Sequence, residues 1–278
     1  MRTLRFYKAS PGGNTTILIL DPVAPPERSE AARVLMAANH LQAEQVGYLD
    51  LRVLPVRLDM MGGEFCGNAC RAAAAVMAQE GVGLAQIDEN FVGELSVSGV
   101  DRPLLVRVDP VQGECWAEMP LPPVSAPDGH EGLRTLEPGI GLVCLPGITH
   151  LCLDESYHPF PSEFAAESAI LRARYGLEGE AVGCIWYRTS PQYAIKPVVW
   201  VRSTASTHYE TGCGSGSLAL ALWLGRGQNF PMALRVLQPS GNEIGVRIDA
   251  EENGLRAWIH GPVALVARGE AFLTSSSG

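Results

Sequence analysis

Hydrophobic and polar residues alternate along most of this chain, with the period of two that is typical of half-buried β-strands. Turn signals rich in glycine, proline and asparagine separate the alternating runs. The pattern predicts strands in both halves: TLRFYK, TTILILD, GYLDLRVL, GELSVSG, LLVRVD and ECWAEM in the first, and GLVCLP, AVGCIWYR, AIKPVVWVR, ALRVLQ, IGVRID, LRAWIHG and PVALVARG in the second.

Four segments depart from this alternation. Helical periodicity and start signals predict amphipathic helices over 27–40 and 161–176. Two further segments, 68–79 and 215–224, are apolar or small on every face, apart from Arg71 in the first. Because a helix that is apolar all round is a buried helix, we predict one central buried helix in each half.

These halves predict an α/β (α+β) fold of two pseudo-symmetric domains, each a mostly antiparallel sheet wrapped around a central buried helix. The proline-rich segment 118–132 is the predicted linker, and the last strand is expected to return to the first sheet. The first domain is therefore expected to comprise 1–120 plus 263–278, and the second 121–262.

Composition and charge argue against some classes of function for this protein. The chain has 278 residues, of which 46% are hydrophobic and 18% charged, as expected for a core-forming protein. Its net charge of −9 argues against a nucleic-acid partner. It has no apolar run of membrane-spanning length, and its start lacks the apolar stretch of a signal peptide, so we expect no membrane association and a cytoplasmic location.

The cysteines are expected to be reduced thiols, because seven is an odd number and no secretory leader is evident. Cys66 and Cys70 have CxxxC spacing, but no second Cys/His cluster completes a tetrahedral set, so we expect no metal site. Most of the others lie in apolar strand contexts and are interpreted as core residues: Cys115, Cys144, Cys152 and Cys184. Cys70 is expected to pack inside.

Two cysteine segments resemble each other: GGEFCGNACRAAAAVMAQEG around Cys66 and YETGCGSGSLALALWLGRG around Cys213. An acidic residue precedes each cysteine by two or three positions, Glu64 and Glu210, and Cys-Gly-(Asn/Ser) leads into an apolar stretch. The two cysteines lie 147 positions apart, about half the chain. A duplicated unit with one thiol in each half suggests a site between the halves that uses two thiols.

A cysteine at a helix N-terminus is set up for chemistry. The unpaired N–H groups and the helix dipole stabilise a thiolate and also bind anions. Amides at Gly67–Asn68 and Gly214–Ser215 could bind one carboxylate, with the two cysteines flanking the adjacent carbon. That arrangement suits racemisation, in which one thiolate removes a proton and one thiol delivers another. A lone cysteine in a buried helix is more often a core residue, but the matched settings favour catalysis here.

At these residues the chain resembles the diaminopimelate epimerase-like family of racemases. The resemblance rests on EFCGNA, GCGSG, QPSGNEIGV, GPVALVARGEAFL and the entry loop SPGGNTTILILD, which puts Asn14 beside the substrate. It implies a two-domain pseudo-symmetric α/β fold, a site at the domain interface, catalysis by Cys66 and Cys213, and no metal, pyridoxal phosphate or other cofactor.

Departures from the diaminopimelate epimerases concern the distal end of the substrate. Thr204 and Ala205 stand where those enzymes have Glu-Arg, and only His150 remains of an Asn-Pro-His motif. Gly183 replaces a substrate-binding asparagine. A second carboxylate without its arginine would be poorly recognised, which disfavours diaminopimelate.

The chain is more similar to the histidine racemases of this family, known from metallophore biosynthesis, through AEQVGYLD, GNTTILI, GGEFCGNA, AVGCI and ETGCGSG. The resemblance implies interconversion of L- and D-histidine. Glu44 is our candidate for binding the imidazole, because a carboxylate accepts from a ring N–H. Its alternatives are an exposed helix-end carboxylate, or the acid–base role that a glutamate near this position has in cysteine-free isomerases of the same fold.

The remaining candidates each have a structural alternative. Glu210 could orient Cys213 or the substrate. Asn14 is either a substrate contact or a turn residue, and His150 either a ligand contact or a satisfied strand histidine. Asn68 and Ser215 could cap their helices through their side chains while their amides face the ligand.

Three other functions stay open at this point. The chain could be a diaminopimelate or other amino-acid epimerase of the same fold, a proton-shifting isomerase that uses Glu44 and one cysteine, or a non-catalytic amino-acid-binding protein. In each case the partner is a small amino-acid-like molecule. The sequence leaves the oligomeric state open, with a homodimer as the candidate assembly.

Overall fold

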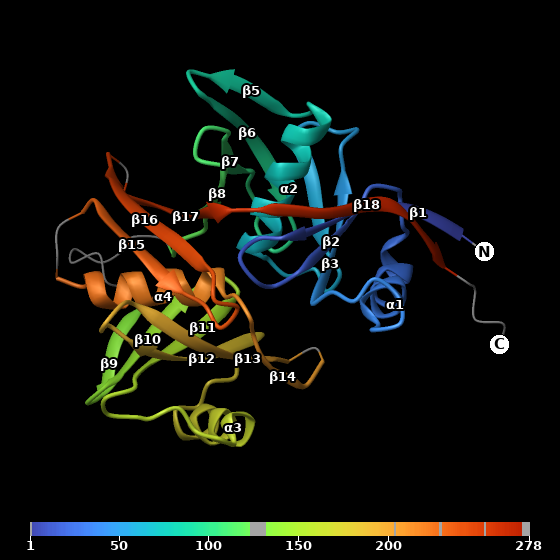
Figure 1. The fold of residues 1–278 in the computed structure, drawn as a ribbon. Coiled ribbons are helices and arrows are strands. Elements are labelled where there is room, and N and C mark those ends of the chain that lie inside the picture. Colours follow the sequence, from blue (N-terminus) through green and yellow to red (C-terminus); the bar gives the residue numbers. More distant parts are fainter. Residues whose placement is uncertain (1, 123–131, 203, 228–229, 253, 274–278) are drawn as a thin grey trace. The chain divides into compact units, whose positions relative to one another are not determined.

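The computed structural model describes residues 2–122, 132–202, 204–227, 230–252 and 254–273 (Figure 1). The chain divides into two compact units, Met1–Glu118 with His260–Gly278 and Met119–Ile259. The sequence analysis places its domain boundaries at 120/121 and 262/263. Most of the predicted linker 118–132, namely 123–131, lies outside the described residues.

The first unit is a mostly antiparallel sheet with two helices. Its elements are β1 (Arg2–Ser10), β2 (Thr16–Ile19), α1 (Pro25–Met36), β3 (Gln45–Asp50), β4 (Val56–Met60), α2 (Gly67–Glu80), β5 (Leu84–Ile87), β6 (Asn90–Val97), β7 (Leu104–Asp109), β8 (Glu114–Met119) and β18 (Ala264–Leu273). Strand β18 pairs antiparallel with β1 along its length, from Arg2 opposite Leu273 to Ser10 opposite Ala264. The predicted return of the last strand to the first sheet is confirmed.

The second unit also contains two helices. Its elements are β9 (Leu133–Glu137), β10 (Ile140–Leu145), β11 (Ile148–Asp154), α3 (Phe164–Arg174), β12 (Ala181–Arg188), β13 (Ala194–Val201), β14 (Ser206–Tyr209), α4 (Gly214–Gly225), β15 (Met232–Leu237), β16 (Glu243–Glu251) and β17 (Gly254–Pro262), the last of which runs on into the first unit.

The two units repeat one order of strand pairing, which confirms the pseudo-symmetric fold. In the first unit β1–β2 is antiparallel, β2–β3 parallel, β3–β4 antiparallel, β4–β6 parallel and β6–β7 antiparallel. In the second unit β10–β11, β11–β12, β12–β13, β13–β15 and β15–β16 follow the same alternation. Helices α1 and α3 bridge the first parallel pair in each unit, and α2 and α4 lie within the second parallel connection.

A buried helix is central to each unit, as predicted. Helix α2 contacts β1, β2, β6, β7 and β18, and helix α4 contacts β10, β11, β12, β13, β15 and β16 (Figure 1). The first eight residues of α2 are all buried, and its alanines Ala72–Ala74 let the sheet approach closely. In α4, Leu218, Leu220 and Trp223 supply bulk. Each fully buried large apolar side chain contributes roughly 1.5–3 kcal/mol to folding.

The sequence pattern misplaced some boundaries. Helix α1 ends at Met36 and not at residue 40, because the chain turns there and Leu41 N–H bonds back to Leu35 C=O at 3.1 Å. The strand predicted to reach residue 54 ends at Asp50, and Leu54 is 75% exposed in the turn before Pro55. Five strands lacked a prediction: β4, β5, β9, β11 and β14. Within the described residues, no helix is long and apolar enough to cross a membrane.

The fit between β10 and α4 depends on Gly141, and we expect Gly141→Ala to destabilise the second unit. A Cβ built at this glycine would lie 2.4 Å from Cε2 of the buried Trp223 ring. Overpacking of this kind costs about 1–3 kcal/mol, measured as the change in unfolding free energy by urea titration. Gly179→Ala is the matched control, since its Cβ would meet nothing nearer than Ala181 O at 3.5 Å. Equal stability of the two variants would contradict this packing.

Candidate active site

Cys66 lies at the N-cap of α2, where the sequence predicted a helix start. Its backbone is extended, with φ −138° and ψ 109°, and its Sγ accepts from Ala69 N–H at 3.5 Å. The thiol is partly exposed. No acidic residue occupies the first turn of α2, where the helix carries a positive partial charge. The amide and the helix dipole both favour a negatively charged sulfur.

The loop that leads to Cys66 is fixed by Ser98. Its hydroxyl donates to Glu64 C=O at 2.7 Å and accepts from Met60 N–H at 2.9 Å. The neighbouring Gly99 has φ +76°, and a Cβ there would lie 2.7 Å from Phe65 N. Ser98 therefore holds the segment between β4 and α2 in place, and the lack of a side chain at Gly99 lets that segment lie close to it.

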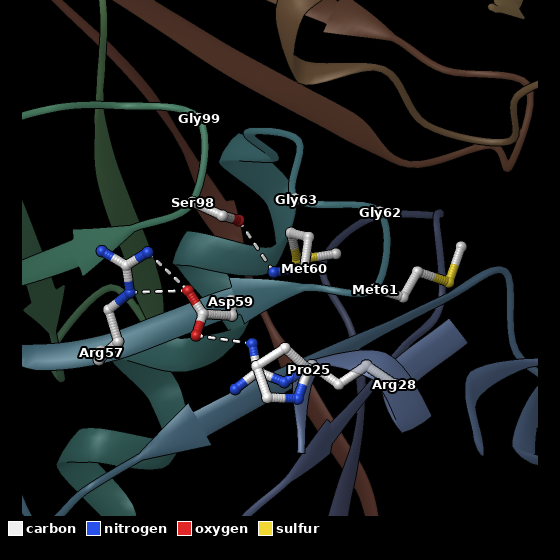
Figure 2. Close-up of a pocket in the computed structure, with 10 residues that line it drawn as sticks. All are labelled: Pro25, Arg28, Arg57, Asp59, Met60, Met61, Gly62, Gly63, Ser98 and Gly99. Atoms are coloured by element: carbon white, nitrogen blue, oxygen red, sulfur yellow. Dashed lines mark hydrogen bonds and ion pairs between the residues drawn. The ribbon is translucent and has the colours of Figure 1, made fainter. Parts of the chain in front are cut away.

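This loop also forms one wall of an open pocket of about 430 Å³ in the first unit (Figure 2). Its lining includes Met60–Gly63 and Ser98–Gly99, and Asp59 lies between Arg28 and Arg57 with contacts of 2.8 and 2.7 Å. Partial burial opposes ionisation of Asp59, but the two arginines outweigh it and lower the pKa of that carboxyl. None of the predicted site residues lines this pocket, so we do not assign the reaction to it.

Cys213 has the same position at the N-cap of α4. Its backbone is also extended, with φ −122° and ψ 104°, and its Sγ accepts from Gly216 N–H at 3.3 Å. Here the residue is buried, with 3% of its surface exposed. The buried Gln238 fixes the cap: its Oε1 accepts from Cys213 N–H at 2.9 Å, and its Nε2 donates to Ser217 Oγ at 3.0 Å. Ser217 Oγ in turn donates to Cys213 C=O at 2.7 Å.

The environment of Cys213 favours its neutral thiol. Burial raises the pKa of Cys213 well above its ordinary value, and the charge of Glu210 and a hydrogen bond with it raise that pKa further. The Ser215 hydroxyl, 3.6 Å from Sγ, and the Gly216 amide act in the opposite direction. Glu210 therefore lies beside Cys213, as one of its two predicted roles requires.

Burial keeps four of the other cysteines as thiols. It raises the pKa of Cys115 and of Cys184 to about 11, and raises the pKa of Cys70 and of Cys152. All four side chains are at most 5% exposed, which confirms their interpretation as core residues. The same interpretation is wrong for Cys144, which is only partly buried and packs against the core of the second unit from its edge.

His150 contacts Ser215, the residue two positions after Cys213. Its Nε2 lies 3.1 Å from Ser215 Oγ, which forms a chain from His150 through Ser215 to Cys213. The ring is fully buried, and burial lowers the pKa of His150 to about 3, so the imidazole is neutral at pH 7. It contacts Ser215 in this structure and reaches no open surface.

Gly183 makes room for that ring. A Cβ at Gly183 would lie 2.2 Å from His150 Nδ1. The two residues are directly paired in neighbouring parallel strands, β11 and β12. The histidine therefore fills the space that an asparagine side chain at position 183 would need.

Asn14 and Glu44 lie in the first unit, just before the paired strands β2 and β3. Asn14 has φ 54°, and its C=O accepts from Thr16 Oγ1 at 3.0 Å. Glu44 Oε1 accepts from Thr15 N–H at 3.1 Å, and Glu44 N–H donates to Thr15 C=O at 2.9 Å. Glu44 is exposed and Asn14 partly exposed, so both side chains are accessible to a ligand.

Each unit thus carries half of the predicted residues. The first unit holds Asn14, Glu44, Cys66, Gly67 and Asn68, and the second holds His150, Glu210, Cys213, Gly214 and Ser215. Sequence reasoning missed the residues that support these groups: Arg71, Ser98, Ser217 and Gln238. Arg71 gave one signal, as the single charged residue among the small and apolar positions of 68–79.

Comparison with known proteins identifies this pair of cysteine-capped units. The family model described as the histidine racemase CntK N-terminal domain matches residues 3–272. The chain belongs to this histidine racemase family. It is 30% identical to a histidine racemase of Fusobacterium nucleatum over 279 residues, and 24% identical to one of Staphylococcus aureus over 283, in both cases with 98% of each chain covered.

A solved structure shares the fold. A hydroxyproline epimerase from Agrobacterium vitis, with bound trans-4-hydroxy-L-proline, superposes with a TM-score of 0.67 at 11% identity, and the match covers 99% of this chain and 94% of that one. As a member of the histidine racemase family, the chain is an isomerase that racemises an amino acid.

The buried neutral His150 predicts a pH dependence of stability. The pKa of histidine is about 6.5 in an unfolded chain and about 3 for His150 in the folded protein. Between these values only the unfolded state binds the proton, so the unfolding free energy falls as pH drops below about 6.5, by at most about 1.4 kcal/mol per pH unit.

We expect His150→Gln to reduce this slope between pH 6.5 and 5, measured by urea denaturation followed through the tryptophan fluorescence of the second unit. His158→Gln is the control, because that histidine is partly exposed and its ring Nε2 lies 3.0 Å from Pro138 C=O, at a surface turn. An unchanged slope in His150→Gln would show that His150 does not titrate in this way.

Proposed function

We propose that the protein interconverts L- and D-histidine by a two-base mechanism with Cys66 and Cys213. The observation that carries this proposal is the repeated capping geometry: each unit presents one sulfur at the N-cap of a buried helix. Acid–base exchange on two faces of one carbon needs two such groups, whereas carboxylate binding alone needs only amides.

The substrate carboxylate would bind the N–H groups at the starts of the two helices, Gly67–Asn68 and Gly214–Ser215. One thiolate removes the α-proton as the C–H bond breaks, and the electron pair passes to the carboxylate as an enediolate. The helix amides stabilise that developing charge. The opposite thiol then donates its proton to the other face of Cα. Each turnover thus exchanges the protonation states of the two cysteines and leaves the net charge unchanged.

The environments of the two sulfurs support one assignment of protonation states before the substrate binds. Cys213 is buried beside Glu210, which favours its thiol form. Cys66 is partly exposed at the positive N-terminal end of α2, which favours a thiolate. In this starting state Cys66 is the base and Cys213 the acid. The other enantiomer is processed from the reverse state.

The relatives support histidine as the substrate. They are named histidine racemases, and this chain matches them over nearly their whole length. The exposed Glu44 offers a carboxylate for the imidazole N–H. The absence of the Glu-Arg pair at Thr204 and Ala205 argues against a second substrate carboxylate. Gly183 argues the same way, because His150 occupies the space of the missing asparagine.

We expect Cys66→Ser and Cys213→Ser each to lose at least about 10²-fold in racemisation, the usual worth of general acid–base catalysis. The assay is loss of the histidine Cα proton in D₂O by NMR, with chiral chromatography of the products. Cys144→Ser is the control, since this thiol is also partly exposed but lies in strand β10. Full exchange activity in either serine variant would refute the two-base proposal.

The same assay separates the alternatives. A panel of L-amino acids that includes diaminopimelate identifies the preferred side chain. A proton-shifting isomerase would give a product with a moved double bond and no inverted amino acid. A binding protein would bind histidine by calorimetry without any exchange at Cα.

Glu44→Gln tests imidazole recognition. Loss of a charge-assisted hydrogen bond to the ring is expected to raise KM for histidine by about tenfold or more, with a smaller effect on kcat. Glu30→Gln is the control, an exposed carboxylate of α1 that bonds Arg33. A collapse of kcat with KM unchanged would instead assign Glu44 the acid–base role found in cysteine-free isomerases of this fold.

A further inference from the structure

Arg71 is a fully buried arginine in the second turn of α2, five residues after Cys66. Its guanidinium makes four hydrogen bonds. Nε donates to Cys115 C=O at 3.2 Å and Nη2 to Pro262 C=O at 3.1 Å. Nη1 donates both to Pro11 C=O at 3.0 Å and to Asn68 Oδ1 at 3.2 Å. All four acceptors are neutral oxygens.

A buried charge of this kind is costly, because taking a cation out of water is unfavourable even when hydrogen bonds replace the solvent. Burial lowers the pKa of Arg71 to about 10, against the opposing effects of Cys115, Glu114 and Cys66. The guanidinium nevertheless stays protonated at pH 7. The helix therefore keeps a fixed positive charge inside the first unit, close enough to Cys66 and Glu114 for their charges to affect it.

The second unit has no such charge at the corresponding place. Five residues after Cys213 comes Leu218, which is fully buried and apolar. Ser215, which corresponds to Asn68, is bonded by the neutral His150. The residue two positions after each cysteine is thus held by a buried side chain, which is cationic in the first unit and neutral in the second.

We propose that Arg71 is a positioning residue for Cys66. Arg71 ties the Pro11–Asn14 loop and the Asn68 side chain to the start of α2, and its positive charge favours the Cys66 thiolate. This inference rests on the proposed function and deepens it. Arg71 touches no substrate. It acts through the loop that carries Asn14, through Asn68, and through the field at Cys66.

The test measures the pH dependence of Cys66 alkylation by iodoacetamide in the full-length protein, with each cysteine followed by peptide mass spectrometry. We expect Arg71→Gln to raise the midpoint of the Cys66 profile by about one pH unit, the lower end of the effect of one nearby opposite charge. Arg71→Lys keeps the charge without the four-bond geometry. Its midpoint is expected to stay near that of the wild type, while exchange at the histidine Cα falls at least about tenfold.

Arg52→Gln is the matched control, because it removes an exposed arginine of the same unit that bonds Asp50. Protection of the buried Cys70 and Cys115 from alkylation reports whether each variant stays folded. The proposal is overturned if folded Arg71→Gln has the wild-type Cys66 profile and exchange rate. It is also overturned if Arg71→Lys exposes Cys70, since Arg71 would then act only in folding. Alkylation needs no substrate, so failure of histidine racemisation alone would count against the proposed function and not against this inference.

Discussion

The structure depends on how a buried helix satisfies its own N-terminus. Helices α2 and α4 are enclosed by their sheets, so their first amides have little access to water, and unpaired buried N–H groups are costly. A cysteine sulfur accepts one of these amides in each unit, from Ala69 or Gly216. The sulfur is therefore at once the cap of the helix and a group exposed to its positive end. The positive helix end that needs a cap also favours a negatively charged sulfur.

Different side chains surround the two cysteine caps. The Cys66 cap is partly exposed, follows a loop that Ser98 holds by hydrogen bonds, and lies five residues before the buried cation Arg71. The Cys213 cap is buried, is held by the amide of Gln238, and has a carboxylate and a neutral imidazole beside it. The two caps share one backbone geometry, and the side chains around them differ. The two-base mechanism that we propose needs one protonated and one deprotonated thiol at the start of each turnover, and these unequal surroundings support it.

Much of this was readable from the sequence. The matched cysteine segments predicted both buried helices, with starts one residue after the observed ones, because uniform apolarity over ten or more positions is typical of a buried helix. The short strand β5 and the exposed turn at Val53–Leu54 were not predictable, since their pattern follows tertiary pairing and not local periodicity. The supports of the caps could not be predicted either. The contact between Arg71 and Pro262 joins residues 191 positions apart, and that between Gln238 and Cys213 spans 25. Residues so far apart in the sequence become neighbours only in the folded chain, so local patterns do not predict these contacts.

The close fit of Gly183 against His150 has an evolutionary consequence. One volume in the second unit accommodates either a side chain at position 183 or the imidazole that steadies Ser215, and not both. Changes at the two positions are therefore epistatic: an asparagine gained at 183 would displace the histidine before it could contact a new substrate. In this chain a side chain at position 183 therefore requires a second substitution that moves or replaces His150.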